Sequence, residues 1–408
     1  MKKLLIVILS IIACLCLAVG FVGCGGNGNE DKGSIDGRYT EANEESFNTA
    51  TEKLGAIISG DKAPVNTEAE KIGGTLNSNG EIKLTVGGKS VVFTASEKLS
   101  ALVDKSKIGE EAAVWSSIID ATQLKLESKL GIKVDDGFGN ALYDMIAFLA
   151  DDEDEIEESV KDYISILDKS NINIDANAYL KDANLYVNAK ASGFTKELKD
   201  LVSKEAKFDL GDLEKGYKYS FDKDGIYSLF DELEEVLEDF LPSFGKNGYD
   251  SEVAIASNTA YTSETSSDFP ISYAELNMYL SMVDMKLYTE ISSDGAVKIK
   301  LATSTTTKDK VLSLIKGYLG KGKNGTLLGI ISDLKIDKLD AEIYVAFDKD
   351  GYLYQVAGNI DVAVSTKIND KTVSLAVNGK LNGALAVPQI DFPSFNGYEN
   401  PFAQNELK

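Results

Sequence analysis

The residues of this chain that could carry acid-base chemistry are its carboxylates. The 408 residues include 65 Asp plus Glu, 42 Lys plus Arg and no His, which gives a formal charge of −23 at pH 7. Catalytic Ser-His and Cys-His groups, imidazole zinc sites and histidine pH switches all need His, so the composition excludes them. The acidic excess also argues against nucleic acid as a partner, because binding a polyanion requires clustered cations.

Paired carboxylates could hydrolyse a polysaccharide if two of them lay about 5 to 9.5 Å apart in a cleft. No spacing in the sequence selects such a pair. The acidic run at 151–158 suits the first turn of a solvated helix, where the helix dipole favours negative charge. Phosphate-binding loops, Gly-x-Ser-x-Gly elbows and dinucleotide fingerprints are absent from the sequence. We therefore expect a protein that is not an enzyme.

One stretch can be aligned with a calcium loop. From Ser220 to Asp231, acidic residues fall on several ligand positions, but position 1 is Ser and the preceding residues alternate as in a strand. A hairpin turn explains this stretch better than a metal site. We expect neither a metal nor another cofactor.

The N-terminal segment has the composition of an export signal. Residues 1–23 hold two lysines, an apolar run from 4 to 22 and no acidic residue. Its end, Phe21-Val22-Gly23-Cys24, resembles the lipobox of bacterial lipoproteins, although that family usually has Leu at the position of Phe21. The resemblance implies a signal peptide over residues 1–23, removed before Cys24, and acylation of that cysteine by diacylglycerol and an amide-linked palmitate-type chain. An uncleaved membrane anchor is the alternative interpretation.

Both interpretations place the rest of the chain on the extracytoplasmic face of the cell membrane. All three cysteines lie in or next to the export signal, at Cys14, Cys16 and Cys24, so we expect no disulfide in the mature part. Processing leaves 40 basic and 65 acidic residues, a charge of −25. Residues 24–40 are predicted to be a flexible tether because the stretch is rich in Gly, Asn and acidic residues.

The mature chain alternates between strand-like and helix-like patterns. Hairpins are predicted where period-two alternation flanks Gly, Asn or Asp: 82–94, 172–191, 341–357 and 362–377. Helices are predicted over 44–58, 97–104, 111–121, 140–149, 151–169, 196–204, 228–241 and 308–319. Since a crossover helix does not follow every strand, we predict an α+β fold with a curved, half-barrel-like antiparallel sheet and helices packed on one face.

The length suggests two similar α+β domains or halves, over 41–245 and 250–393. A pentapeptide at 221–225, Phe-Asp-Lys-Asp-Gly, recurs at 347–351 and hints at a repeat. Three of the six prolines lie after residue 387, so residues 388–408 are read as an extended segment on the sheet surface, with 394–408 as the C-terminal tail.

Two groups of residues are candidates for an apolar ligand cavity. Flexible thioethers suit variable apolar ligands, and three methionines fall in the strand-like stretch 273–291. Small residues on the packed face of the hairpin 172–191 leave room for a ligand. The candidates are Met278, Met282, Met285, Ala176, Ala178 and Ala189.

A third group is predicted to face the membrane. The apolar stripe of helix 308–319 lies beside lysines that concentrate positive charge in an acidic protein, a pattern that suits an anionic lipid surface. These lysines are Lys308, Lys310, Lys316, Lys321 and Lys323. An amphipathic helix packed on the sheet explains the same pattern.

The lipidated start, the long hairpins up to residue 387 and the Pro-aromatic end together resemble the LolA/LppX-like lipoprotein superfamily. The resemblance implies an incomplete antiparallel barrel around helices, with an apolar cavity for acyl chains and no catalytic residue. The chain is longer than one such domain, which leaves either a duplication or an inserted middle part. We therefore expect a cell-surface lipoprotein that binds a lipid or another apolar ligand. A structural or adhesive lipoprotein with a filled core and a carboxylate-based polysaccharide hydrolase are the alternatives.

Overall fold

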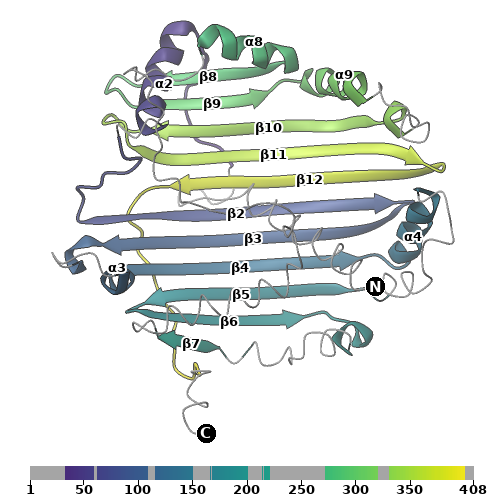
Figure 1. The fold of residues 1–408 in the computed structure, drawn as a ribbon, viewed down its shortest axis with the longest axis horizontal. Coiled ribbons are helices and arrows are strands. Elements are labelled where there is room, and N and C mark those ends of the chain that lie inside the picture. Colours follow the sequence, from purple (N-terminus) through teal and green to yellow (C-terminus); the bar gives the residue numbers. More distant parts are fainter. Residues whose placement is uncertain are drawn as a thin grey trace, which may run out of the picture.

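One antiparallel sheet dominates the structure, a computed structural model that describes residues 33–58, 62–108, 115–149, 166, 168–200, 214, 216–220, 272–319 and 330–399. Its 12 strands follow the order β1-β8-β9-β10-β11-β12-β2-β3-β4-β5-β6-β7 (Figure 1). The strands are β1 (Thr40–Glu41), β2 (Lys71–Val86), β3 (Lys89–Asp104), β4 (Thr122–Val134), β5 (Asn171–Lys181), β6 (Asn184–Ser192), β7 (Tyr217–Ser220), β8 (Met285–Ile291), β9 (Val297–Thr303), β10 (Lys335–Phe347), β11 (Leu353–Ile368) and β12 (Lys371–Ala384). The predicted antiparallel sheet with helices is confirmed at this level.

All four predicted hairpins are confirmed. Three of them have two-residue turns with positive φ, which Gly, Asn and Asp adopt at low cost, whereas residues 348–352 join β10 to β11. Gly87 and Gly88 join β2 to β3 with φ of 56° and 82°. Asn369 and Asp370 join β11 to β12 with φ of 48° and 57°. These turns set the register of each hairpin and therefore the face on which each side chain lies.

The two predicted halves contribute to the same sheet. β12, near the C-terminal end, pairs with β2 over a register that runs from Val373 opposite Val86 to Ala384 opposite Thr75. The predicted boundary at 246–249 and the first copy of the repeated pentapeptide lie outside the described residues. The division into two halves stays a prediction, while the strands on both sides of it form one continuous ladder.

The labelled α-helices of the described part of the chain lie at the strand ends and along the β1 and β8 edge (Figure 1). They are α2 (Glu44–Ile58), α3 (Trp115–Ala121), α4 (Phe138–Leu149), α8 (Tyr273–Val283) and α9 (Thr307–Leu319), and a short 3-10 helix, η1 (Lys105–Lys107), follows β3. The helices predicted at 44–58, 140–149 and 308–319 are confirmed. Of the one predicted at 111–121, residues 115–121 are helical and residues 111–114 lie outside the described part. Residues 196–200 are helical, whereas the helix predicted at 228–241 and nearly all of the one at 151–169 lie outside the described residues.

The helix predicted at 97–104 is wrong. This stretch is the second half of β3, a 16-residue strand that pairs with β2 on one side and β4 on the other. Its leucines and valine fit helical spacing, but Leu99, Ala101 and Val103 also alternate with period two. Pairing with a strand on each side satisfies the backbone over the whole length, and this tertiary effect overrides local propensity.

The strand predicted over 273–291 is wrong in its first half, which forms helix α8. Ser272 caps this helix: its hydroxyl accepts the Glu275 N–H, and the Glu275 carboxylate accepts the Ser272 N–H. Asp284 ends it in the left-handed conformation, with φ of 56° and ψ of 41°. The sequence contains this capping box as the pattern Ser-x-x-Glu, which is the local helix signal that sequence reasoning missed.

Both ends of the described chain pack on the sheet. Ile35 is 5% exposed and packs against Tyr344, Ala346 and Ala357, so the predicted tether is docked from Gly33 onward. This contact corrects the expectation of a flexible tether up to residue 40: a buried isoleucine stabilises the docked segment by removing apolar surface from water.

The extended C-terminal segment predicted after residue 387 is confirmed as far as Glu399. It crosses the sheet and reaches β7, where Tyr217 and Glu399 form a parallel bridge. The Phe395 ring stacks on Tyr186 at 3.8 Å between centroids. Residues 400–408 lie outside the described part.

Candidate functional site

Strand alternation gives the sheet one apolar and one polar face. From β12 through β2, β3, β4, β5 and β6 the ladders run without a register shift, so side chains line up in rows across the strands. On β3, for example, Phe93, Ala95 and Leu99 lie on one face, while Thr94 and Ser96 lie on the other. Each row therefore collects positions far apart in the sequence.

Two adjacent rows across the middle of the apolar face are made mostly of small residues. We call them the small-residue belt; its small members are Gly379, Gly80, Ala95, Ala191, Ser78, Ser128, Ala176 and Ala189, and its larger members are Leu130, Ile174, Leu381 and Glu97. Bulky side chains flank it on both sides, with Ile82, Phe93, Ile132 and Ile172 in one row and Leu76, Leu99 and Leu126 in the other. The apolar face is therefore lower at the small members of the belt than beside it, while Leu130, Ile174 and Leu381 narrow the belt.

Helices cover the ends of this face. Phe138 of α4 packs with Val86, Val91 and Val134, which lie at one end of β2, β3 and β4. α3 contacts β3 and β4 at their opposite end. Two of the predicted cavity residues, Ala176 and Ala189, face each other in the belt, and Ala178 lies in the next row.

The predicted methionines do not join the alanines. Met278 and Met282 lie on α8 and are 52% and 55% exposed, while Met285 begins β8. The pocket beside Met285 measures about 30 Å³, the space of roughly one water molecule. Eight strand spacings separate β8 from β5, about 38 Å, so the two groups line no common cavity.

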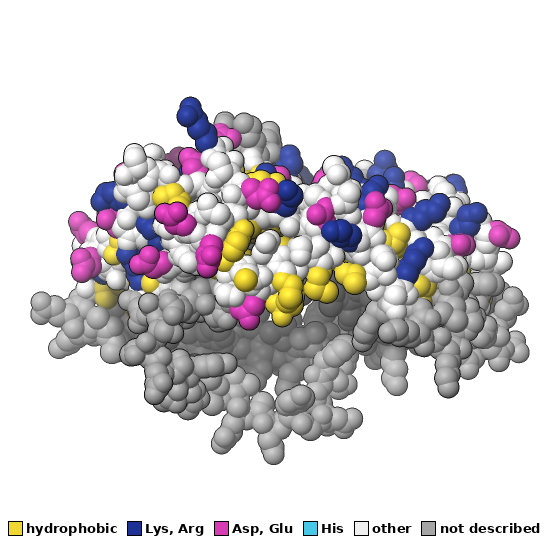
Figure 2. Space-filling model, turned by 90° about the horizontal axis from the view of Figure 1, so that it is seen from above, with side chains coloured by type: hydrophobic (Ala, Val, Ile, Leu, Met, Phe, Trp, Pro, Cys, Tyr) yellow, Lys and Arg dark blue, Asp and Glu magenta, His cyan; other side chains and the backbone are white. Residues whose placement is uncertain are grey.

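Exposed apolar side chains gather where α8 and α9 meet. Tyr279 is 56% and Leu314 48% exposed, and together with Met278 and Met282 they define the α8–α9 patch. Viewed from the side of α2 and α8, hydrophobic side chains collect along this edge, with lysines beside them (Figure 2).

Three of the predicted membrane-facing lysines lie on α9. Lys308 is half-buried, and Lys310 donates to the Ser281 carbonyl at 3.1 Å and lies 3.7 Å from the Asp284 carboxylate. Lys316 donates to the Ser332 carbonyl at 2.8 Å. Lys321 and Lys323 lie outside the described residues, as does Cys24.

The segment that follows the predicted lipidation site is held on the polar face of the sheet. Asn359 donates its side-chain amide to the Gly33 carbonyl at 3.2 Å, and Lys298 donates to the Asp36 carbonyl at 2.8 Å. A Cβ on Gly33 would lie 2.3 Å from the Gly358 carbonyl oxygen, so this close approach needs glycine. Cys24 precedes Gly33 by nine residues, a reach of at most about 30 Å.

A hydrogen-bonded cluster under this segment centres on Glu342. Lys300 Nζ lies 2.6 Å from one carboxylate oxygen. The Tyr344 hydroxyl donates to the other oxygen at 2.6 Å, and the Asn359 amide donates to it at 3.1 Å. Burial acts to raise the pKa of Glu342, but the hydrogen bonds from Lys300, Tyr344 and Asn359 outweigh it, so this pKa is lowered. Burial, followed by the Glu342 hydrogen bond, raises the pKa of Tyr344.

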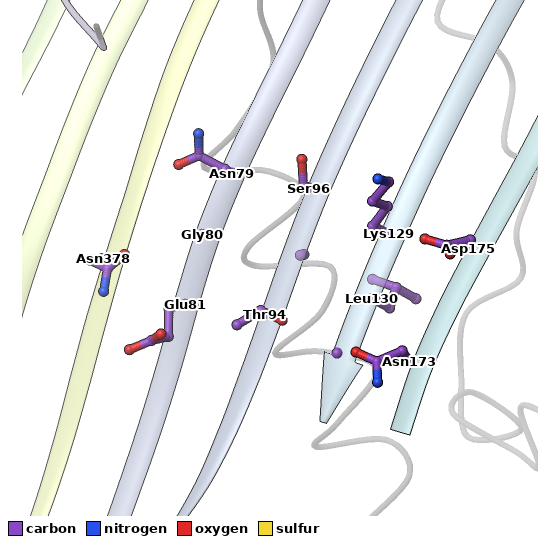
Figure 3. A pocket seen from close by; sticks show the side chains of 12 residues that line it. Asn79, Gly80, Glu81, Thr94, Ser96, Lys129, Leu130, Asn173, Asp175 and Asn378 are labelled. Carbon is purple, nitrogen blue, oxygen red and sulfur yellow. The ribbon is translucent and has the colours of Figure 1, made fainter. Parts of the chain in front are cut away.

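The polar face has a shallow depression of about 530 Å³ over β12, β2, β3, β4 and β5 (Figure 3). Asn79, Glu81, Thr94, Ser96, Lys129, Asn173, Asp175 and Asn378 line it, with Gly131 between Thr94 and Asn173. Sequence reasoning missed these residues because only the register of five strands brings them together.

The carboxylates of this depression do not match a glycosidase pair. Glu81 lies on β2 and Asp175 on β5, three strand spacings apart, or about 14 Å between backbones. Paired catalytic carboxyl groups lie about 5 to 9.5 Å apart. The depression therefore suits contacts with a polar molecule better than acid-base catalysis by these two residues.

No helix in the described part of the chain is long and apolar enough to cross a membrane. Within the same residues, no cluster of three or more His, Cys, Asp or Glu side chains has the arrangement of a metal site. Comparison with protein-family models and with curated proteins finds no match to this chain.

Proposed function

We propose that this protein is a non-catalytic lipoprotein, anchored through Cys24 on the extracytoplasmic face of the cell membrane, that binds a lipid or another apolar ligand against the apolar face of the sheet. The observation that carries the proposal is the small-residue belt. Small side chains between two bulky rows leave a trough, and apolar surface in a trough is stabilised when an apolar molecule removes it from water.

The dimensions of the belt support an acyl chain as the ligand. From β12 to β6 it spans five strand spacings, about 24 Å. One leaflet of a bilayer core, the depth filled by one acyl chain, is about 15 Å thick. We propose that the sheet curves like a half-barrel around the ligand, with its apolar face inside.

The fold also supports an internal repeat as the origin of the long sheet. A hairpin, a helix and a third strand follow one another in β2-β3-α3-β4 and again in β8-β9-α9-β10. We propose that the two halves are related in this way. Superposition of the two units in an experimental structure tests this, and different strand directions or twists would contradict it.

Lipid content tests ligand binding. The chain purified from its own host should carry extractable lipid and show a bound mass in native mass spectrometry. Replacing Ala176 by Leu places a larger side chain in the belt. The amount of bound lipid should then fall severalfold, since a packed site tolerates extra volume poorly. Asp175→Leu, on the opposite face of the same strand, is the matched control and should leave it unchanged.

A homogeneous ligand-free mass for the wild-type chain would contradict lipid binding and favour the structural or adhesive alternative. Equal lipid content in Ala176→Leu and Asp175→Leu would place the ligand elsewhere.

The α8–α9 patch is proposed to touch the membrane. Four exposed apolar side chains on α8 and α9, with Lys308 and Lys310 also on α9, suit the interface of an anionic bilayer. A fluorophore on Met282→Cys should be quenched by nitroxide lipids in vesicles that contain phosphatidylglycerol. The same fluorophore on Asn378→Cys, on the polar face, should not be quenched by these lipids. Equal quenching at both positions would contradict this orientation.

A further inference from the structure

Glu97 occupies an unusual place on the apolar face. Across β12, β2, β3, β4, β5 and β6 it is the only charged side chain on this face, apart from Lys371 and Lys89 at the first residues of β12 and β3. Along its own strand, Ala95 and Leu99 flank it on the same face. Glu97 is half-buried, and an apolar ligand that covers a carboxylate makes its charge costly unless the ligand neutralises it.

Two serines lie directly beside Glu97. Ser78 on β2 and Ser128 on β4 are its register partners on either side. In antiparallel pairs, opposite Cα atoms are about 4.5 to 5.5 Å apart, so the three side chains form one compact group. We call it the Ser-Glu-Ser triplet. It lies within the small-residue belt, between β12 and β6.

The triplet has donors and acceptors without partners in the protein. Ser78 is only 6% exposed. Among the residues that the structure describes, none forms a hydrogen bond or an ion pair with Ser78, Glu97 or Ser128. Glu97 and Ser128 are half-buried, so an apolar ligand that covers them takes away the hydrogen bonds that water gives them. A ligand that restores these bonds would therefore be favoured at this position.

We infer that the Ser-Glu-Ser triplet binds the ammonium head group of an amphiphile whose chain lies along the belt. An ammonium group supplies the missing positive charge and three N–H donors, which match one carboxylate and two hydroxyl oxygens. A carboxylate head group would be repelled by Glu97. The inference rests on the proposed function and specifies the chemical class of its ligand.

The placement of the triplet also fits an extended chain. From Glu97 the belt continues over Ser128 and Ala176 to Ala189, three strand spacings or about 14 Å. One leaflet of a bilayer core is about 15 Å thick, so a head group at β3 leaves room for most of one acyl chain towards β6.

The test uses head groups of opposite charge on the same chain. The full-length protein in a non-ionic detergent is incubated with equimolar hexadecylamine and hexadecanoic acid, and native mass spectrometry measures the ratio of the two adducts. Wild type should prefer the amine by about tenfold or more, equivalent to about 1.4 kcal/mol. Glu97→Gln should bring the ratio close to that expected from the overall negative charge alone.

Glu81→Gln is the matched control. It makes the same chemical change on the polar face of β2, so its net charge equals that of Glu97→Gln and any general attraction of amines to an acidic protein is the same. It should keep the wild-type ratio.

The outcomes separate this inference from the proposed function. If neither amphiphile binds wild type, lipid binding itself fails. If both bind and Glu97→Gln keeps the wild-type preference, lipid binding stands and the role of the Ser-Glu-Ser triplet is overturned. Glu97→Leu provides a second variant, which should still bind hexadecanoic acid while losing the preference for the amine.

Discussion

At the residue scale, Glu342 joins the N-terminal segment to the sheet. It accepts hydrogen bonds from Tyr344 and Asn359 and lies within 2.6 Å of Lys300 Nζ, while Asn359 also holds the Gly33 carbonyl. Tyr39 packs edge-on against Tyr344, with ring centroids 5.8 Å apart. Gly33, the first residue that the structure describes, is thus linked to a charged cluster on β9, β10 and β11.

The lowered pKa of Glu342 predicts a pH dependence of stability. Since the folded chain holds this carboxyl below its ordinary value of 4.5, the unfolded chain binds more protons in acid. The stabilisation is present above about pH 4.5 and is lost as pH falls further. At pH 7, Glu342→Gln should lower the free energy of unfolding by about 1 kcal/mol. Urea denaturation at pH 7 and pH 3.5 measures the free energy of unfolding of wild type and of Glu342→Gln.

The difference between wild type and Glu342→Gln should shrink at the lower pH. Tyr344→Phe removes one donor and should give a smaller effect in the same direction. A difference that stays constant between the two pH values would contradict the assigned role of the charge.

At the scale of elements, local signals predicted the hairpins and most described helices, because turn residues and helical spacing act within a few residues. They failed for the second half of β3 and for α8. Pairing with a strand on each side makes the second half of β3 a strand. The Ser272 capping box, whose Ser-x-x-Glu pattern is present in the sequence, starts helix α8. Neither the Glu342 cluster nor the polar depression could be predicted, since both need the register of several strands.

The C-terminal segment is an element whose role only the fold reveals. It lies against β7, the last strand of the sheet, where Lys218 N–H donates to the Glu399 carbonyl at 2.8 Å. Edge strands with free backbone groups pair with other chains, so a covering segment protects against association. The rings of Phe395, Tyr186 and Tyr398 hold the segment in place.

Phe395→Ala should release this segment. Loss of the stacked ring lowers the free energy that holds the segment on the sheet by up to about 3 kcal/mol, which is enough to release a short extended stretch. Hydrogen exchange should speed up in residues 388–399 and in β7, while β2 and β3 stay protected. Ser394→Ala, at an exposed neighbour, is the control. Light scattering should show association that grows with protein concentration, and a strictly monomeric variant would contradict the protective role.

At the scale of the whole molecule, β12 and β2 unite segments that are almost 300 residues apart in the sequence. They lie at the centre of the sheet order, with five strands on either side of the pair. Pairing over this sequence distance closes a very long loop, which makes folding slow. The pairing of β12 with β2 also depends on both parts of the chain.

This pairing predicts cooperative opening of the central strands. Amides of β2 and β12 that bond to each other, around Ser78 and Leu381, should exchange with one opening free energy, because neither strand can open alone. Edge strand β7 should exchange faster and serves as the internal control. Two distinct opening free energies for β2 and β12 would indicate two independent domains.

The sequence by itself determined the charge, the absence of histidine chemistry, the lipobox-like Cys24, and the alternation that makes strands of one polar and one apolar face. These properties depend on residue type or on neighbours within a few positions. Only the tertiary structure decided that β12 pairs with β2, that Met282 is exposed, and that Ser78, Glu97 and Ser128 meet on the apolar face. Such contacts join residues far apart in the chain, and only strand order and register fix which of them become neighbours.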